Sequence, residues 1–167
     1  MQLLQTRFET GPGLASTALC IFSSSAAKQQ PASSLLLSSS LVQDYAEPVL
    51  DLLDPDDSIF SHRLFRDSCR RLADGQYIKD LSILGRDLRS TIIVDNTPSV
   101  YSLHLDNAIP ISSWFSDPTD KALLQLLPLL CHLANVGDVR SPLRRIYRLQ
   151  DLVFPRPCMA LKSTASH

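Results

Sequence analysis

The clearest hydrophobic pattern in the chain is a run of three β-branched residues, Ile-Ile-Val, at positions 92–94. Such a run is typical of a strand that is buried on both faces, as in a parallel sheet. The strand should end at Asp95 and Asn96, because Pro98 cannot continue a hydrogen-bonded ladder. Residues 107–111 form a second run of the same kind. These runs favour an α/β fold built on a mainly parallel sheet.

Two longer segments show the spacing of apolar residues that is typical of amphipathic helices. Residues 41–54 form the first, with Pro48 expected to weaken or kink it. Its inward positions would be Val42, Tyr45, Val49, Leu52 and Leu53. Residues 118–135 form the second, with Asp117 as the N-cap and Pro118 in the first turn. Its buried stripe would consist of Leu123, Leu126, Leu127, Leu130 and Ala134.

Composition and charge narrow the class of protein. The 167 residues suit one domain, with 44% hydrophobic and 20% charged residues as in ordinary globular chains. A net charge of −1 gives no signal for binding polyanions, so nucleic acid is not expected as a direct partner. The four cysteines form no CxxC pair, which favours reduced thiols in the nucleus or cytoplasm. No run reaches the roughly 18 apolar residues of a membrane span.

Residues 1–40 differ from the rest of the chain because they are rich in serine and poor in charge. A transit peptide would be rich in arginine, whereas Arg7 stands alone, and residues 14–22 lack the basic cluster that precedes a signal sequence. We therefore expect an atypical or disordered leader there. The expected domain covers residues 41–154, and residues 155–167 form a loose tail.

Polar residues flank the first predicted strand and suggest a binding site. Lys79 precedes it and can neutralise a phosphate as a point charge. Asp95 and Asn96 follow it, and a carboxylate with a carboxamide offers the oxygen ligands that Mg²⁺ takes. The carboxyl ends of strands are where open α/β sheets bind ligands. The alternative is that Asp-Asn-Thr-Pro is only a turn.

The same stretch resembles a known family. GQYIKDLSILGRDL followed by STIIVDNTP is similar to the last two motifs of the RNA polymerase II C-terminal-domain small phosphatases, in the haloacid dehalogenase (HAD) superfamily. The similarity continues in the family's order as YAEPVLDLLD, HRLFRDSC, DNAIPISSWFSDPTD and LLQLLPLLCHL. It implies a HAD-like, mainly parallel sheet flanked by helices. It also implies Mg²⁺-dependent removal of phosphate from a phosphoserine-containing protein or peptide.

The resemblance assigns roles to the residues around the predicted strand. Lys79 and Asp95 would be catalytic, with Lys79 and the metal neutralising the charge of the phosphoryl group. Asp95 and Asn96 would hold Mg²⁺. Ser39 is the nearest candidate for the Ser or Thr that hydrogen-bonds the phosphoryl group, although it also fits a serine-rich linker.

Two further residues match positions that the family uses for its substrate. Arg66 lies where family members place an arginine beside the phosphate, and a guanidinium suits that task because it binds oxyanions through two hydrogen bonds. A surface arginine at the end of a strand remains the alternative. Tyr45 matches an aromatic residue that helps to hold a proline of the peptide substrate. A tyrosine that covers the edge of the core remains the alternative there.

The chain departs from the family at its first motif. Family members open with an apolar strand that ends in Asp-x-Asp-x-Thr, where the first aspartate is the nucleophile and the second the general acid/base. In residues 1–60, Glu9 is the only acid before Asp44, and Asp54 follows a helix rather than a strand. We therefore expect the sheet to lack its first, central strand and its nucleophile.

Two interpretations follow from the missing motif. The chain is a truncated or mis-spliced phosphatase without activity, or it is a non-catalytic binding module. The mitochondrial inner-membrane import translocase has a subunit with such a module, although a mitochondrial role would call for an Arg-rich leader. A parallel sheet without its central strand exposes unpaired backbone groups. Marginal stability is expected unless residues 14–22 or 33–38 take its place.

Overall fold

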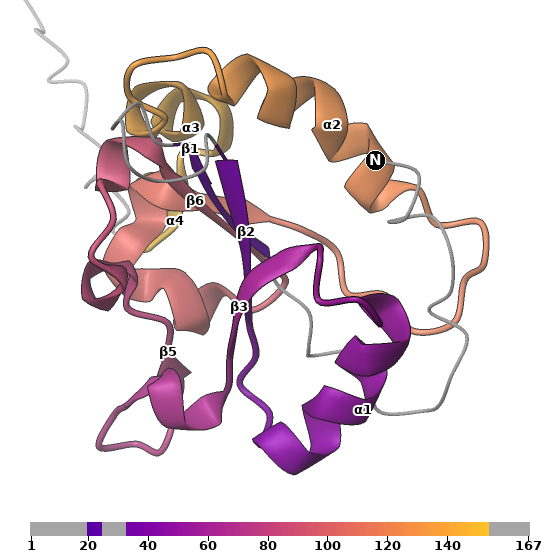
Figure 1. Ribbon diagram of the computed structural model, residues 1–167. Coiled ribbons are helices and arrows are strands. Elements are labelled where there is room, and N and C mark those ends of the chain that lie inside the picture. The colour runs from indigo at the N-terminus through magenta and orange to yellow at the C-terminus, as the bar shows by residue number, and fades with distance from the viewer. Residues whose placement is uncertain (1–19, 25–32, 154–167) are drawn as a thin grey trace, which may run out of the picture.

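The computed structural model describes residues 20–24 and 33–153 (Figure 1). Its main sheet has five strands in the order β3-β2-β1-β6-β7. These strands are β1 (Cys20–Ser24), β2 (Ser33–Ser38), β3 (Phe60–Leu64), β6 (Thr91–Asp95) and β7 (Ala108–Pro110). A separate hairpin pairs β4 (Arg70–Arg71) with β5 (Tyr77–Ile78).

Helices lie on both sides of the sheet in the view of Figure 1, with α1 below it and α2 and α3 above. The α-helices are α1 (Gln43–Leu53), α2 (Ala122–Leu133), α3 (Arg140–Tyr147) and α4 (Leu149–Val153). Four 3₁₀ segments connect the other elements: η3 (Arg66–Ser68), η4 (Leu81–Leu84), η5 (Leu88–Ser90) and η6 (Pro98–Asn107). The mixed α/β class is therefore as predicted.

The centre of the sheet corrects the prediction of a missing first strand. β1 lies between β2 and β6 and runs antiparallel to both. By contrast, β2 pairs with β3, and β6 with β7, in parallel. A short segment of reversed direction thus occupies the central position and satisfies the backbone groups that β2 and β6 would otherwise leave unpaired. The sheet is mixed rather than mainly parallel.

Both β1 and β2 precede residue 41, where the composition placed the start of the domain. β2 nevertheless pairs with β3 along Leu35–Ser38, and β1 pairs with β6. The expected boundary at residue 41 does not mark an edge of the sheet. The leucines of β2 extend the apolar pattern into a serine-rich segment, and this local pattern outweighs the segment's overall composition.

Buried side chains form two clusters that meet at β2. Leu36 belongs to the larger cluster and Leu37 to the smaller one, because successive side chains of a strand point to opposite faces. The smaller cluster adds Ala46, Leu50 and Phe65. The larger cluster contains Leu36, Leu81, Ile92, Ile93, Val94, Val100, Tyr101, Ala108, Ile109, Leu133, Val139 and Leu143.

Helix α1 turns a different face to the core than its sequence suggests. Ala46 and Leu50 are buried, whereas Tyr45 is 50% and Leu52 76% exposed. Leu53 alone among the predicted inward residues packs against the smaller cluster, as expected. Two apolar stripes run side by side along this helix, so amphipathicity alone does not choose between them. The stripe that contains Ala46 faces the core, because it is the one that packs against Leu37 and Phe65.

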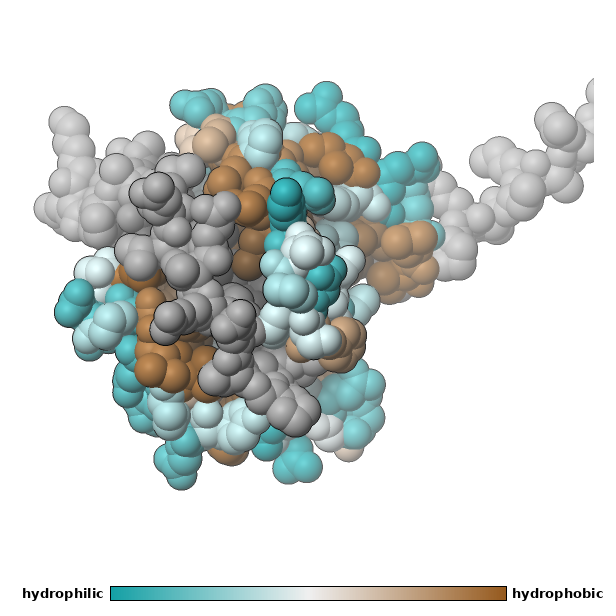
Figure 2. Space-filling model, turned by 90° about the vertical axis from the view of Figure 1, so that its right-hand side faces the viewer, coloured by the Kyte–Doolittle hydropathy of each residue, from teal (hydrophilic) through white to brown (hydrophobic). Residues whose placement is uncertain are grey.

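Helix α2 begins at Ala122 rather than at Pro118. Asp117 caps a separate turn instead, where its carboxylate accepts hydrogen bonds from the backbone N–H and hydroxyl of Thr119. The buried stripe is also shifted: Leu133 is buried, Leu126, Leu129 and Leu130 pack against the larger cluster, and Leu123 and Ala134 are exposed. Figure 2, which faces the side that carries α1 and α2, shows hydrophobic patches between hydrophilic areas.

Candidate functional site

Lys79 lies directly after β5, where its backbone N–H donates to the carbonyl of Val100 at 2.7 Å. Its side chain is only 5% exposed. The ammonium donates to Asp95 Oδ2 at 2.9 Å and to the carbonyl oxygen of Ser38 at 2.7 Å. Lys79 and Asp95, both candidate site residues from the sequence, are therefore in direct contact.

Asp95 is the last residue of β6 and is 4% exposed. Its second carboxylate oxygen, Oδ1, accepts a hydrogen bond from the backbone N–H of Thr97 at 2.8 Å. Its backbone carbonyl accepts from the N–H of Ile111 at 3.2 Å. The segment is thus a turn, as one interpretation held, and the same turn fixes the carboxylate that receives Lys79.

The lysine connects the carboxyl ends of two strands that are not neighbours. Ser38 ends β2 and Asp95 ends β6, and β1 lies between these strands. Because β1 is antiparallel, its first residue, Cys20, pairs with Leu37 near this edge. The carboxyl end of β1, Ser24, lies beside Ser33 at the opposite edge. A parallel central strand would instead have its carboxyl end at the edge where Lys79 lies.

The predicted metal ligands, Asp95 and Asn96, both have other polar partners in this arrangement. Asp95 already receives the Lys79 ammonium, which would repel a nearby cation. The Asn96 side chain donates its N–H to Ser113 Oγ at 2.8 Å and accepts from the Thr97 hydroxyl at 3.4 Å. Within residues 33–153, no group of three or more His, Cys, Asp or Glu side chains is placed to hold a metal. Asp95 and Asn96 therefore offer few of the six oxygen ligands that Mg²⁺ prefers, and binding of the metal there stays a prediction.

Ser39 and Arg66 lie together at the turn that follows β2. Ser39 is fully buried, and its hydroxyl oxygen accepts from the backbone N–H of Leu41 at 3.1 Å. Arg66 Nε donates to the carbonyl of Ser40 at 2.7 Å, and its guanidinium lies 5.2 Å from the ring centre of Tyr77. Arg66 is thus anchored to the same turn as Ser39. Contact of either residue with a phosphate stays a prediction.

Tyr45 projects from α1 with half of its surface exposed. Its neighbour Ala46 and Leu50, one turn further on, fill the core instead. The structure therefore leaves the tyrosine ring available to a partner rather than using it to cover the core. Its role in holding a peptide proline stays a prediction.

Three groups at the site were not found from the sequence. The carbonyl of Ser38 binds Lys79, and a backbone group has no signal in the sequence. Burial raises the pKa of the half-buried Cys69 thiol, which lies 3.9 Å from the carbonyl of Ser39. Burial also raises the pKa of the Tyr101 hydroxyl, and the charge of Asp95 adds to this effect. Only the distant pairing of strands brings these groups together.

Comparison with known proteins identifies relatives for most of the described chain. The sequence model of the NLI interacting factor-like phosphatase family matches residues 30–140. A "Probable C-terminal domain small phosphatase" from Dictyostelium discoideum is 60% identical over 96 residues, 58% of this chain and 31% of the relative. "Carboxy-terminal domain RNA polymerase II polypeptide A small phosphatase 2" from Homo sapiens is 47% identical over 112 residues, 67% of this chain and 40% of the relative.

A third relative extends the set to another group of phosphatases. "CTD nuclear envelope phosphatase 1B" from Danio rerio is 49% identical over 111 residues, 66% of this chain and 45% of the relative. The chain thus spans less than half the length of these curated relatives. Among residues 20–24 and 33–153, no helix has both the length and the apolar character that crossing a membrane requires.

Proposed function

Because the chain belongs to the NLI interacting factor-like phosphatase family, we propose that its 167 residues bind a phosphoserine-containing protein segment without hydrolysing it. The observation that carries the proposal is the buried Lys79, held between the carboxyl ends of β2 and β6. It is the cationic part of a phosphatase site, and the sequence supplies no Asp-x-Asp-x-Thr motif to complete it. In this proposal a member of the phosphatase family acts as a non-catalytic binding module.

Recognition of a phosphate would rest on N–H donors at the turn after β2. A lysine ammonium has three N–H donors, and Asp95 and the carbonyl of Ser38 accept two of them. The third can donate to a phosphoryl oxygen. Arg66 uses its Nε toward Ser40, and its guanidinium has further N–H groups for an oxyanion. Tyr45, exposed on α1, would contact the residues that flank the phosphoserine.

Hydrolysis would require a carboxylate in line with the leaving oxygen, and the acids nearest to the start of the domain do not provide one. Burial favours the protonated form of Asp54, but the backbone N–H groups of Phe60, Ile59 and Ser58 more than offset this and lower its pKa. Both of its oxygens are therefore engaged in holding the loop after α1. Asp44 lies exposed in the first turn of α1.

Mg²⁺ and the cellular location enter the proposal only through the family. When bound in a complete site of this family, the metal would neutralise phosphoryl charge. We propose that this chain binds it weakly, because Asp95 is paired with Lys79. A nuclear or cytoplasmic location agrees with the scattered cysteines, and the mitochondrial role stays the alternative.

The first test is an assay of aryl phosphate hydrolysis with excess Mg²⁺. We expect no turnover above the buffer rate, with the Dictyostelium relative assayed in parallel as the reference protein. Turnover that both Lys79→Ala and Asp95→Ala abolish would contradict the proposal and mean that another acid acts as nucleophile.

The second test measures binding of a labelled phosphoserine peptide and of its unphosphorylated counterpart. We expect preference for the phosphorylated peptide, weakened by Lys79→Gln and by Arg66→Ala in proteins whose circular dichroism is unchanged. Equal binding of the two peptides would exclude phosphate recognition. Arg71→Ala is the matched control, because Arg71 is an exposed arginine on β4.

A further inference from the structure

A second group of cationic side chains lies on α3 and at its C-terminal end, at Arg148. A hollow of about 270 Å³ there is lined by Arg144, Arg145, Arg148, Gln150 and Asp151. It shares no residue with the site around Lys79. Figure 1 shows α3 near the top of the molecule and the β5 hairpin, which leads into Lys79, further down.

The backbone at Arg148 forms the hollow. This residue has φ 50° and ψ 35°, the left-handed conformation, and its N–H donates to the carbonyl of Arg144 at 3.1 Å. Glycine is the usual residue at such a helix end, because a side chain is unfavourable there. The turn directs the chain straight into α4 and places Gln150 and Asp151 beside the arginines of α3.

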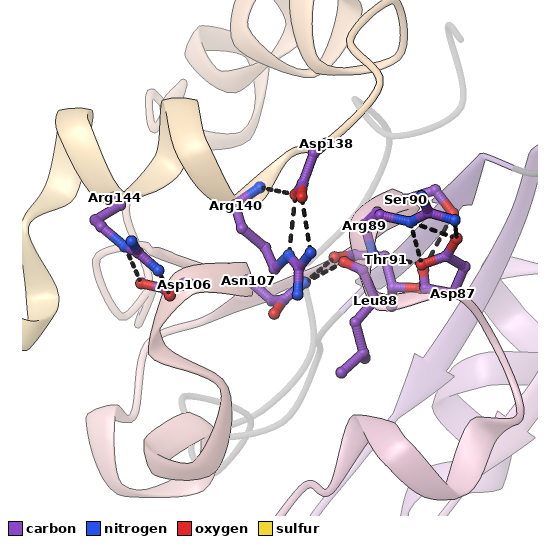
Figure 3. A network of polar contacts seen from close by, with 10 residues as sticks. All are labelled: Asp87, Leu88, Arg89, Ser90, Thr91, Asp106, Asn107, Asp138, Arg140 and Arg144. Carbon is purple, nitrogen blue, oxygen red and sulfur yellow. Dashed lines mark hydrogen bonds and ion pairs between the residues drawn. The ribbon is translucent and has the colours of Figure 1, made fainter.

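Two of the three arginines have one carboxylate partner each. Arg144 binds Asp106, which also accepts a hydrogen bond from Gln150 Nε2 at 2.9 Å. Figure 3 shows this pair, with Arg140 bound to Asp138 beside it. Arg148 donates from Nε and Nη2 to a single oxygen of Asp151, at 2.9 and 2.7 Å.

Arg145 differs from these two because it is exposed and has no hydrogen-bond or ion-pair partner among the described residues. Each guanidinium has five N–H donors, and the pairs of Arg144 and Arg148 use only Nε and Nη2. The hollow therefore has many donors and few acceptors. A tetrahedral oxyanion with several acceptor oxygens matches such a set.

We propose that this hollow binds a phosphate group carried by a protein segment, at a place separate from Lys79. Three arginines and Asp151 line it, and Asp106 adjoins it, so its net charge is about one positive unit. An anionic membrane attracts clusters of several uncompensated basic residues, and one surplus charge is too weak for that. A single phosphorylated side chain in the hollow needs no large surface charge, because the N–H groups of the arginines that line it can bind the phosphate oxygens directly.

Apolar side chains on the same two helices also favour a peptide. Ile146 of α3 is 52% and Leu152 of α4 77% exposed. They offer contact to residues that flank a phosphorylated position, which a free phosphate would not use. This inference stands on the α3–α4 surface alone and does not require the proposed function to be correct.

The experiment uses fluorescence anisotropy with a labelled peptide that carries one phosphoserine between leucines, and with its serine counterpart. The Lys79→Gln protein isolates the second site. In it, we expect phosphate-dependent binding to remain, and an added Arg145→Ala to weaken it by about tenfold through loss of a charge-assisted contact. Arg145→Lys should recover part of the affinity. Arg145 has no partner to lose within the described part of the chain, so folding should be unaffected.

Three results would overturn the inference. The first is equal binding of both peptides, and the second is equal weakening by Arg145→Ala and by the matched control Arg71→Ala. The third is binding to phosphatidylserine vesicles that depends on Arg145 while the peptide does not bind, which would make the surface a membrane contact. If the Lys79→Gln protein keeps its circular dichroism spectrum but loses all binding, the inference fails while the proposed function survives. If inorganic phosphate competes with the phosphorylated peptide, this would support binding through the phosphate group.

Discussion

The two sides of the sheet are stabilised in different ways. The larger cluster packs β6, β7, η6 and α3 around side chains such as Ile93 and Ile109, which are fully buried. Among the residues that the structure describes, the smaller cluster, under α1, buries Leu37, Ala46, Leu50 and Phe65, with Leu41, Leu53 and Phe60 packed against them. One side therefore resembles the core of a complete domain, whereas the other has little apolar surface to bury.

Polar contacts support the side that lacks a large core. Arg63 of β3 binds Asp51 at 2.6 Å and Asp57 at 2.7 Å, and it also donates to the carbonyl of Asp54. These contacts fix α1 and its following loop to the edge strand. Lys79 then connects the two sides, because its ammonium binds the end of β2 and the end of β6. The candidate site thus lies between the side of the sheet that carries the larger cluster and the side that polar contacts support.

The largest effect is expected from breaking this connection. Lys79→Met should lower the free energy of unfolding by about 3–5 kcal/mol, because it leaves the Asp95 carboxylate buried without a counter-charge. The double variant Lys79→Met with Asp95→Leu should recover much of that loss. Urea unfolding of the three proteins measures both values. If the double variant were less stable than Lys79→Met, the pair would not be the connection described here.

A smaller effect should distinguish the two clusters. Leu133→Ala, at a residue 1% exposed in the larger cluster, should cost about 3 kcal/mol, and Leu50→Ala, in the smaller cluster, about 2 kcal/mol. Leu127→Ala is the control on α2; its side chain is only partly buried, so less than about 1 kcal/mol is expected. The order of the three urea midpoints tests the comparison. A larger loss at Leu50 than at Leu133 would reverse it.

The smallest effect concerns a polar contact beside the larger cluster, at Asp80. The hydroxyl of Ser82 and then His104 lower the pKa of Asp80 to about 2. Because the folded pKa lies below the ordinary value of 3.8, this carboxylate stabilises the fold above pH 3.8, and the gain disappears as the pH falls through about 2.

Asp80→Asn should therefore cost about 1–2 kcal/mol at pH 7, and the difference from the unchanged protein should shrink below pH 4. Ser82→Ala should act in the same direction with a smaller cost. Thermal melts between pH 2 and pH 7 provide the measurement. A difference that stays constant over this range would show that the charge of Asp80 does not stabilise the fold.

Local features of the sequence predicted the strand that carries Asp95 and the polar turn after it. The β-branched run predicted β6, and its polar end located Asp95. The family resemblance led to Lys79 and the contact between the two. The carbonyl of Ser38 was not predictable, because it acts through the backbone of a strand distant in sequence. The face of α1 also depends on what packs against it, as the exposed Tyr45 shows.

The direction of β1 could not be read from the sequence for a different reason. Alternation of side chains is the same whichever way a strand runs, so a five-residue segment such as β1 carries no information on its direction. The prediction of a sheet without its first strand used the missing acidic motif, which concerns chemistry rather than backbone pairing. A short strand needs only compatible hydrogen-bond partners on each side to enter a sheet.

The central position of β1 has a consequence for the kinetics of folding. Ile21 pairs with Leu36, which is close in sequence, and with Ile93, which is far along the chain. The first pairing is local and forms at low entropic cost, whereas the second closes a long loop. The innermost strand therefore joins its two neighbours at different times. Assembly of the sheet is completed at its middle, and the slow, high-contact-order step is the docking of the β1–β2 pair onto β6.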